Sequence, residues 1–286
     1  MDLQSLVDQP GKLPTIAKVG QRLMASFSSN DVSIGEIATQ LSADTALSAK
    51  LLRLANSAYF HVSHTVGTVE SALHMLGFVM VRNLVLGSSM AGAYKSIVGM
   101  DLRQFWRYNL YTACSARWLA QRADFNADLV FTLGLMHGIG QLQMHTVIPQ
   151  AVAPLDKQMG VLDVSRTQLE LDTLGFHYGQ VSAELAQLWN FPPTLVAAMR
   201  HIAKPLAAPE FSEAAAWVHM GTWRARCEVL SLSPEDQATT YPVEVGRRLH
   251  LDSGWTGTLA NQLPQDDSSL MPPLLQLTEG LEVMFE

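Results

Sequence analysis

Residues 43–56 read Ala-Asp-Thr-Ala-Leu-Ser-Ala-Lys-Leu-Leu-Arg-Leu-Ala-Asn. Leu47, Leu51 and Leu54 recur at three- and four-residue steps, which places them on one face of a helix. The same spacing continues on both sides of this segment, and no stretch alternates apolar and polar residues with the period of a strand. The sequence therefore predicts an all-α fold.

Further helices are expected around this segment. Ser33 and Glu36 stand three residues apart, the spacing of a capping box in which two side chains satisfy backbone N–H groups at a helix start. The N-terminal helices are predicted over residues 16–27, 33–41, 43–56, 69–76 and 78–94.

The rest of the chain has the same period. Asp101 is expected to cap a long helix, and Pro149 is expected to end another. Predicted helices cover residues 101–121, 128–145, 165–174, 181–189, 193–201, 214–227, 243–251 and 274–285. Residues 231–241 and 263–273 are rich in turn formers. With a break at 97–100, we predict an N-terminal helical half at 10–97, a second half at 98–227, and a C-terminal helical extension at 228–286.

Composition excludes several classes of protein. Apolar residues make up 48% of the 286 positions and charged residues only 16%, which excludes disorder for most of the chain. The net charge of −7 argues against non-specific nucleic-acid binding, which needs a basic face. Two cysteines, Cys114 and Cys227, cannot form a disulfide framework and indicate a reducing compartment.

The longest apolar stretch, residues 72–93, is almost long enough to cross a bilayer. Arg82 and Asn83 stand at its centre, where a charge is unfavourable in lipid, and glycines interrupt it. We interpret it as two buried helices. The first eleven residues lack the basic and apolar regions of a secretory signal. We therefore expect no membrane association and a cytoplasmic location.

Histidines dominate the polar residues within apolar helical surroundings. His137, His177, His201 and His219 are of this kind. Any one of them is more often a hydrogen-bonded core residue than a ligand. A catalytic metal site also needs carboxylates, and none stands at a motif spacing with these histidines, so spacing alone gives a weak case for metal. Phosphate-binding glycine loops and a nucleophile elbow are absent from the sequence.

Two structural readings concern packing and DNA contact. Residues 33–56 could be mistaken for a helix-turn-helix. The leucines turn the second helix inward, which argues against contact with DNA. Gly134 and Gly221 are expected to allow close helix approach, although simple tolerance of glycine is an equal alternative. The tryptophans are expected to be core anchors; they are Trp106, Trp118, Trp189, Trp217 and Trp223.

The order of segments resembles the HDOD family. In the N-terminal half the resemblance rests on Leu13-Pro14, Ile34-Gly-Glu-Ile-Ala38, Leu51-Leu-Arg-Leu-Ala-Asn-Ser57, Val69-Glu-Ser-Ala-Leu-His-Met-Leu-Gly77 and Val81-Arg-Asn-Leu-Val85. In the second half it rests on Phe105-Trp106, Gly134-Leu-Met-His-Gly-Ile-Gly140 and residues 177–192. The resemblance covers residues 10–225. It implies a two-subdomain helical bundle whose second subdomain is similar to the HD superfamily of metal-dependent phosphohydrolases.

The resemblance also implies that the metal ligands of that superfamily are lost here. The first histidine position falls on Tyr108, and the adjacent His-Asp pair falls on His137-Gly138. The distant aspartate falls near Gly221-Thr222, and a usual lysine is replaced by Gln141. His177 and His201 match later histidines of many relatives, with Arg200 where a second adjacent histidine often stands. Tyr108, His137, Gly138, His177 and His201 are therefore candidates for a vestigial pocket, with no metal and no cofactor expected.

Two functional hypotheses follow. The first is a non-catalytic bacterial regulatory module that acts by contact with other signalling proteins, and whose degenerate pocket could sense a small ligand. The alternative is a residual metal-dependent phosphohydrolase or phosphodiesterase that uses His137, His177 and His201. Gly138 favours the first, because it removes the carboxylate that would offset the charge of a divalent cation.

Overall fold

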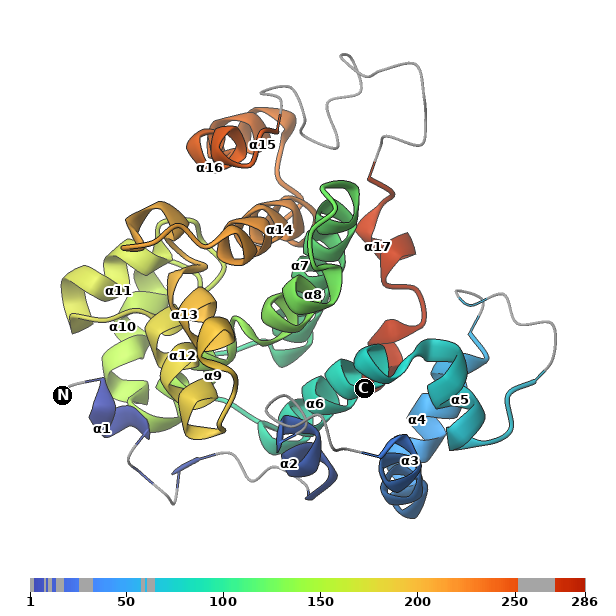
Figure 1. Ribbon diagram of the computed structural model, residues 1–286. Helices are drawn as coiled ribbons and strands as arrows, with labels where there is room; N and C mark the ends of the chain where they lie inside the picture. The colour runs from blue at the N-terminus through green and yellow to red at the C-terminus, as the bar shows by residue number, and fades with distance from the viewer. Residues whose placement is uncertain are drawn as a thin grey trace, which may run out of the picture.

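Every regular element in the described part of the chain is a helix. The computed structural model describes residues 3–7, 9, 12–13, 18–25, 33–57, 60, 65–251 and 271–285. Figure 1 shows an N-terminal group of helices beside a larger group formed by the middle of the chain. The all-α prediction is confirmed.

The leucines that repeat at helical spacing in residues 43–56 are buried within the N-terminal group. Leu51 and Leu54 are fully buried, and Asp44 caps their helix by accepting from the backbone N–H groups of Ala46 and Leu47. The helices are α2 (Lys18–Ala25), α3 (Ile34–Ala43), α4 (Thr45–Ala55), α5 (Val69–Leu76) and α6 (Phe78–Ala93). Parts of the predicted helix at 16–27 lie outside the described residues.

The apolar stretch 72–93 belongs to two buried helices, as predicted. Gly77, with a φ of 82°, ends α5, and α6 follows with an angle of 113° between the two helices. Within the described residues no single helix is long and apolar enough to span a membrane, although this bent pair has the required length and composition.

The larger group begins with the longest helix of the described chain. The order is α7 (Leu102–Arg122), α8 (Ala127–Met136), α9 (Ile139–Val147), α10 (Pro149–Gln158), α11 (Arg166–Leu174), α12 (Tyr178–Leu188), α13 (Pro193–His201), η3 (Pro205–Ala207) and α14 (Glu213–Val229). The short helices α15 (Pro234–Thr240) and α16 (Val243–Arg248) follow at the edge of the molecule (Figure 1). Asp101 caps α7 as predicted, accepting from the N–H of Gln104 at 3.0 Å.

Two glycines bring α8 and α14 close to α7. A Cβ at Gly134 would lie 2.7 Å from the Cα of Ala113, and one at Gly221 would lie 2.7 Å from the carbonyl oxygen of Thr112. Real Cβ atoms do not approach backbone this closely, so only glycine permits this packing. The expectation of close helix approach is confirmed at both positions.

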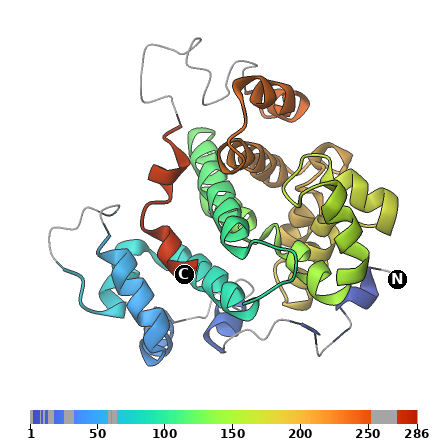
Figure 2. The same cartoon turned by 180° about the vertical axis from the view of Figure 1, so that it is seen from behind.

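Both ends of the described chain pack on other helices, and the C-terminal end contacts both groups. The short helix α1 (Gln4–Val7) packs on α9 and α12, and Gln143 donates to the carbonyl of Leu6 at 3.1 Å. At the other end, α17 (Leu274–Leu277) contacts α7, and η5 (Leu281–Phe285) contacts α4, α6 and α7. Figure 2 shows this segment lying between α6 and α7. The domain limits at 97 and 227 remain predictions.

The structure differs from the predicted elements at several places, and the segment predicted over 274–285 is divided into α17 and η5. The helix predicted over 128–145 is broken at His137 and Gly138 into α8 and α9. Ser33 precedes α3, but its side chain makes no capping hydrogen bond. Pro149 begins α10 instead of only ending α9, because a proline in the first turn needs no N–H. The turn-rich segment 231–241 contains α15.

Candidate functional site

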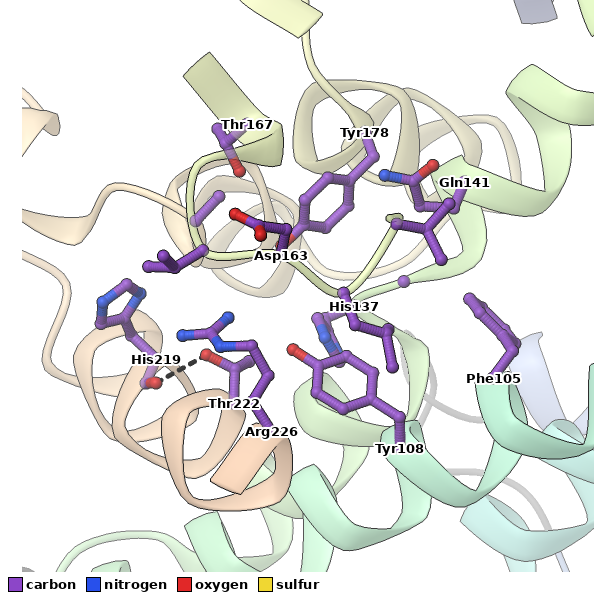
Figure 3. Close-up of a pocket in the computed structure, with 15 residues that line it drawn as sticks. Phe105, Tyr108, His137, Gln141, Asp163, Thr167, Tyr178, His219, Thr222 and Arg226 are labelled. Carbon is purple, nitrogen blue, oxygen red and sulfur yellow. Dashed lines mark hydrogen bonds between the residues drawn. The ribbon is translucent and has the colours of Figure 1, made fainter. Parts of the chain in front are cut away.

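A small cavity lies between α7, the junction of α8 and α9, and α14, and the loop before α11 covers it (Figure 3). Its volume is about 30 Å³, which is room for one or two water molecules. We call it the α7–α14 pocket. Its lining residues are Phe105, Tyr108, His137, Gly138, Gln141, Val161, Leu162, Asp163, Val164, Thr167, Tyr178, Ala203, His219, Thr222 and Arg226.

His137 lies directly after α8, with a side chain that is only 1% exposed. Its Nδ1 is 2.7 Å from the carbonyl oxygen of Gly134, so Nδ1 carries the proton and donates. The lone pair is then on Nε2, a buried atom that has no hydrogen-bond partner among the described residues. Burial, aided by the positive charge of Arg226, lowers the pKa of His137 to about 4. The imidazole is therefore neutral at pH 7.

Gly138 is the N-cap residue of α9, and the surrounding space explains why it is glycine. Its N–H donates to Oδ1 of Asn109 at 3.2 Å. An added Cβ would lie 2.8 Å from that oxygen and 3.1 Å from the ring of Phe105. A side chain at this position would thus require the side chains of Asn109 and Phe105 to move. Glycine lowers stability in the interior of a helix. Gly138 stands at the junction of two helices, so this cost does not arise here.

Tyr108 and α14 supply the opposite wall. The Tyr108 ring packs edge-on against His137, with centroids 5.4 Å apart. Thr222 donates to the carbonyl of His219 at 2.7 Å. Figure 3 shows Arg226 extending from α14 into the pocket, with the Tyr108 hydroxyl nearby. Burial raises the pKa of Tyr108, and the guanidinium of Arg226 opposes that rise.

The residues present do not fit a metal ion. Asp163 is the one acidic side chain among the lining residues; it is exposed and accepts from the N–H of Ser165 at 2.8 Å. Arg226 forms no ion pair within the described chain. In the part of the chain that the structure describes, no three His, Cys, Asp or Glu side chains are placed to hold a metal ion. A permanent guanidinium stands where a metal site needs negative charge.

His177 and His201 do not line this pocket. His177 caps α12: its Nδ1 accepts from the N–H of Gly179 at 3.1 Å, while its own N–H donates to Oε1 of Gln180 at 3.0 Å. Burial lowers the pKa of His177 to about 4. His201 is half-buried at the end of α13. Among the five predicted pocket residues, the structure brings together Tyr108, His137 and Gly138 and leaves the two later histidines apart.

A buried polar network lies behind the pocket. Gln141 donates to Oε1 of Glu170 at 2.7 Å. The same carboxylate pairs with Nε of Arg166 at 3.0 Å and accepts from the N–H of Tyr178 at 2.8 Å. Burial raises the pKa of Glu170, and these donors oppose it. Gln141 therefore serves this network through its amide.

Sequence reasoning missed several residues of the site. Arg226 could have been found, because His219, Thr222 and Arg226 follow each other at helical spacing on one face of α14. Asn109 and Asp163 had no such signal. They reach the site through contacts between segments distant in sequence.

The comparison with protein families identifies the HDOD domain over residues 13–205, more than half of the chain. The chain belongs to the HDOD domain family. An uncharacterised protein of Treponema pallidum is 24% identical to this HDOD chain over 210 residues. That alignment covers 72% of the chain but 41% of the relative, so the chain spans about two fifths of the length of that protein.

Solved structures share the fold of this HDOD protein. A candidate phosphohydrolase from Shewanella amazonensis has a TM-score of 0.72 and 26% identity, covering 98% of this chain and 96% of its own. An HDOD domain protein from Geobacter sulfurreducens has a TM-score of 0.69 and 21% identity, covering 89% and 90%. A candidate signal transduction protein from Marinobacter aquaeolei has a TM-score of 0.68 and 22% identity, covering 86% of this chain and 55% of its own.

Proposed function

We propose that this HDOD protein is a non-catalytic regulatory module that acts by contact with other signalling proteins in the cytoplasm. The observation that carries the proposal is the composition of the α7–α14 pocket. Arg226 brings a fixed positive charge to the side of the pocket formed by Tyr108, His137 and Thr222, and Gly138 supplies no carboxylate to offset a cation.

Charge supports this proposal. A divalent cation in a phosphohydrolase is offset by carboxylates, which also orient the attacking water. Here the lining side chains offer one guanidinium, one exposed carboxylate and neutral imidazoles. The cation of Arg226 would repel a metal ion, and no pair of acids is present among the lining residues to counter it.

The small size of the α7–α14 pocket also favours a function by protein contact over catalysis. A cavity of about 30 Å³ holds water but cannot hold a nucleotide or a phosphodiester unless the covering loop moves. Ligand sensing at this pocket is the secondary part of the proposal. It would use the unpartnered Nε2 of His137 as an acceptor and Arg226 as a donor.

Hydrolysis of bis(4-nitrophenyl) phosphate tests the catalytic half of the proposal. The intact protein is assayed with added manganese, iron, zinc or nickel, beside a His137→Ala variant. We expect both proteins to match the metal-only blank. Turnover by the intact chain that the His137→Ala change abolishes would support the residual phosphohydrolase instead.

Affinity capture from the native cell with the intact chain tests the contact half. We expect a discrete partner that, once purified, rebinds the intact chain saturably. If no captured protein rebinds in purified form, a contact-based function is contradicted.

A further inference from the structure

A second and much larger hollow lies on the other side of α7. It has a volume of about 690 Å³ and lies between α4, α6, α7 and η5. We call it the α6–α7 groove; its lining residues are Lys50, Ser88, Ala91, Gly92, Tyr94, Lys95, Leu102, Arg103, Trp106, Arg107, Leu110, Glu282 and Phe285. Figure 2 shows η5 between α6 and α7 at this place. The helix α7 separates the two hollows, because Phe105 and Tyr108 face the pocket whereas Trp106 and Arg107 line the groove.

The charge of the groove is opposite to that of the whole chain. Four basic side chains line it, Lys50, Lys95, Arg103 and Arg107, against the single carboxylate of Glu282. The chain as a whole carries a net charge of −7. A concave surface lined by one sign of charge concentrates ligands of the opposite sign.

Arg103 and Arg107 on α7 repel each other unless an anion binds beside them. Arg103 and Arg107 are four residues apart, so they are like-charged neighbours on one helix face. Arg103 also lies in the first turn, where the helix dipole disfavours a cation. Within the described residues Arg103 and Lys95 form no ion pair, and the nearby carboxylate of Asp101 is used in capping the helix.

The opposite wall holds a positioned ammonium group. Nζ of Lys50 lies 3.1 Å from the carbonyl oxygen of Met284 and 3.4 Å from Oγ of Ser88, so the chain fixes it at the groove. Glu282 accepts a hydrogen bond from the hydroxyl of Thr278. Even without Lys50, the lining has three further cations, Lys95, Arg103 and Arg107, against this one carboxylate, which leaves room for an anion with more than one negative charge.

The size and the apolar part of the lining indicate an organic ligand. A volume of about 690 Å³ falls in the range of small-molecule sites and is far larger than an inorganic phosphate ion needs. Leu102, Ala91 and Phe285 add partly exposed apolar surface beside the charges. We propose that the α6–α7 groove binds an organic phosphate of nucleotide size that carries at least two negative charges.

Such a ligand would contact both helix groups at once. Lys50 and Lys95 belong to the N-terminal group and the segment that follows it, whereas Arg103 and Arg107 belong to α7. Binding would therefore stabilise the arrangement of the two groups. This inference does not rest on the α7–α14 pocket or on the absence of catalysis.

Calorimetric titration of the intact protein with ADP at low ionic strength tests the proposal, with pyrophosphate as the comparison. The test variant is Arg103→Gln/Arg107→Gln, whose side chains are exposed. The matched control is Arg247→Gln/Arg248→Gln, which removes the same charge from exposed positions on α16. We expect ADP to bind more tightly than pyrophosphate, the test variant to weaken ADP binding by about tenfold or more, and the control to change it little.

Three outcomes would overturn the proposal. These are no saturable binding of ADP to the unmodified chain, equal weakening by test and control variants, and tight binding of an oligoglutamate peptide where ADP does not bind. Circular dichroism of the Arg103→Gln/Arg107→Gln variant checks that it is folded. If that variant is misfolded, Lys95→Gln takes its place, and unchanged ADP binding by this variant contradicts the proposal.

Discussion

The ring of His137 is held in one tautomer by a single backbone carbonyl, and this fixes its acid–base behaviour. Nδ1 donates to Gly134, and the buried Nε2 is left with a lone pair and no partner. Protonation would place a second positive charge in a small cavity that Arg226 already lines. The folded protein therefore resists protonation of this residue far below the pH at which an unfolded histidine accepts a proton.

The pH dependence of the unfolding free energy should reflect the titration of His137. Since the folded pKa of about 4 lies below the usual 6.5, the unfolded state binds the proton first, and stability is lost as pH falls from 6.5 toward 4. His137→Asn keeps an amide donor for Gly134 but does not titrate. We expect the loss of unfolding free energy between pH 7 and pH 5 to be about 1–2 kcal/mol smaller in this variant.

Urea unfolding at the two pH values measures this difference. His74→Asn, which makes the same substitution at an exposed histidine on α5, is the matched control. An identical pH dependence in His137→Asn and the unmodified protein would show that His137 is not a buried neutral group.

Gly138→Asp restores the missing carboxylate of the pocket and should be harmful. Its Cβ would collide with Oδ1 of Asn109 and the ring of Phe105, so we expect a loss of about 1–3 kcal/mol of unfolding free energy. Gly160→Asp is the control, since a Cβ there meets no atom within 4 Å. Thermal unfolding distinguishes them, and equal stability of Gly138→Asp and the unmodified chain would contradict the packing argument.

At the scale of helices, the junction of α8 and α9 is fixed by hydrogen bonds from other helices. Ser182 on α12 accepts from the N–H of Gly140 at 2.8 Å and donates to the carbonyl of His137 at 2.7 Å. Asn109 on α7 accepts from the N–H of Gly138. Side chains of two neighbouring helices thus provide hydrogen-bond partners for backbone groups on both sides of the break.

Ser182→Ala should leave two buried backbone groups without partners. The expected loss of stability is about 1–3 kcal/mol, the penalty for unsatisfied buried polar groups. Ser96→Ala, at an exposed position after α6, should change little. Chemical denaturation measures both variants, and a Ser182→Ala protein as stable as Ser96→Ala would show that water replaces the hydroxyl.

Sequence reasoning located most helices and only part of the site. Amphipathic helices such as α4 and α7 were predictable because their apolar residues repeat on one face. The break at Gly138 was not, because residues 130–145 are buried on all sides and give no periodic boundary. The resemblance pointed to Tyr108, His137, Gly138 and the Gly221-Thr222 region, and in the structure Tyr108, His137, Gly138 and Thr222 line one cavity. The two later histidines share that pattern, but the structure gives His177 a capping role away from the pocket.

At the scale of the whole molecule, the C-terminal segment joins the two helix groups. Met284 is fully buried, and Phe285 stacks on Trp106 of α7 with centroids 5.6 Å apart. Glu228 on α14 accepts from the N–H groups of Leu274 and Leu275 at 3.2 and 3.3 Å. These contacts make the segment part of one continuous core that includes residues of both groups.

Met284→Ala should therefore destabilise the whole chain. We expect a loss of about 2–5 kcal/mol from burial and cavity terms, seen as a lower midpoint of thermal unfolding. Leu275→Ala changes a side chain in the same segment that is 67% exposed, and its effect should stay within about 0.5 kcal/mol. If both variants unfold at the same midpoint as the unmodified protein, the segment does not hold the groups together.

The metal content of the purified protein tests the central claim most directly. The intact chain is incubated with manganese, iron, zinc and nickel in turn, freed of unbound ions by gel filtration, and measured by elemental analysis beside His137→Ala. A pocket that Arg226 lines and that Gly138 deprives of an acid should retain far less than one ion per chain, with no difference between the two proteins. Near-stoichiometric metal that disappears in His137→Ala would contradict the account of a non-catalytic HDOD module.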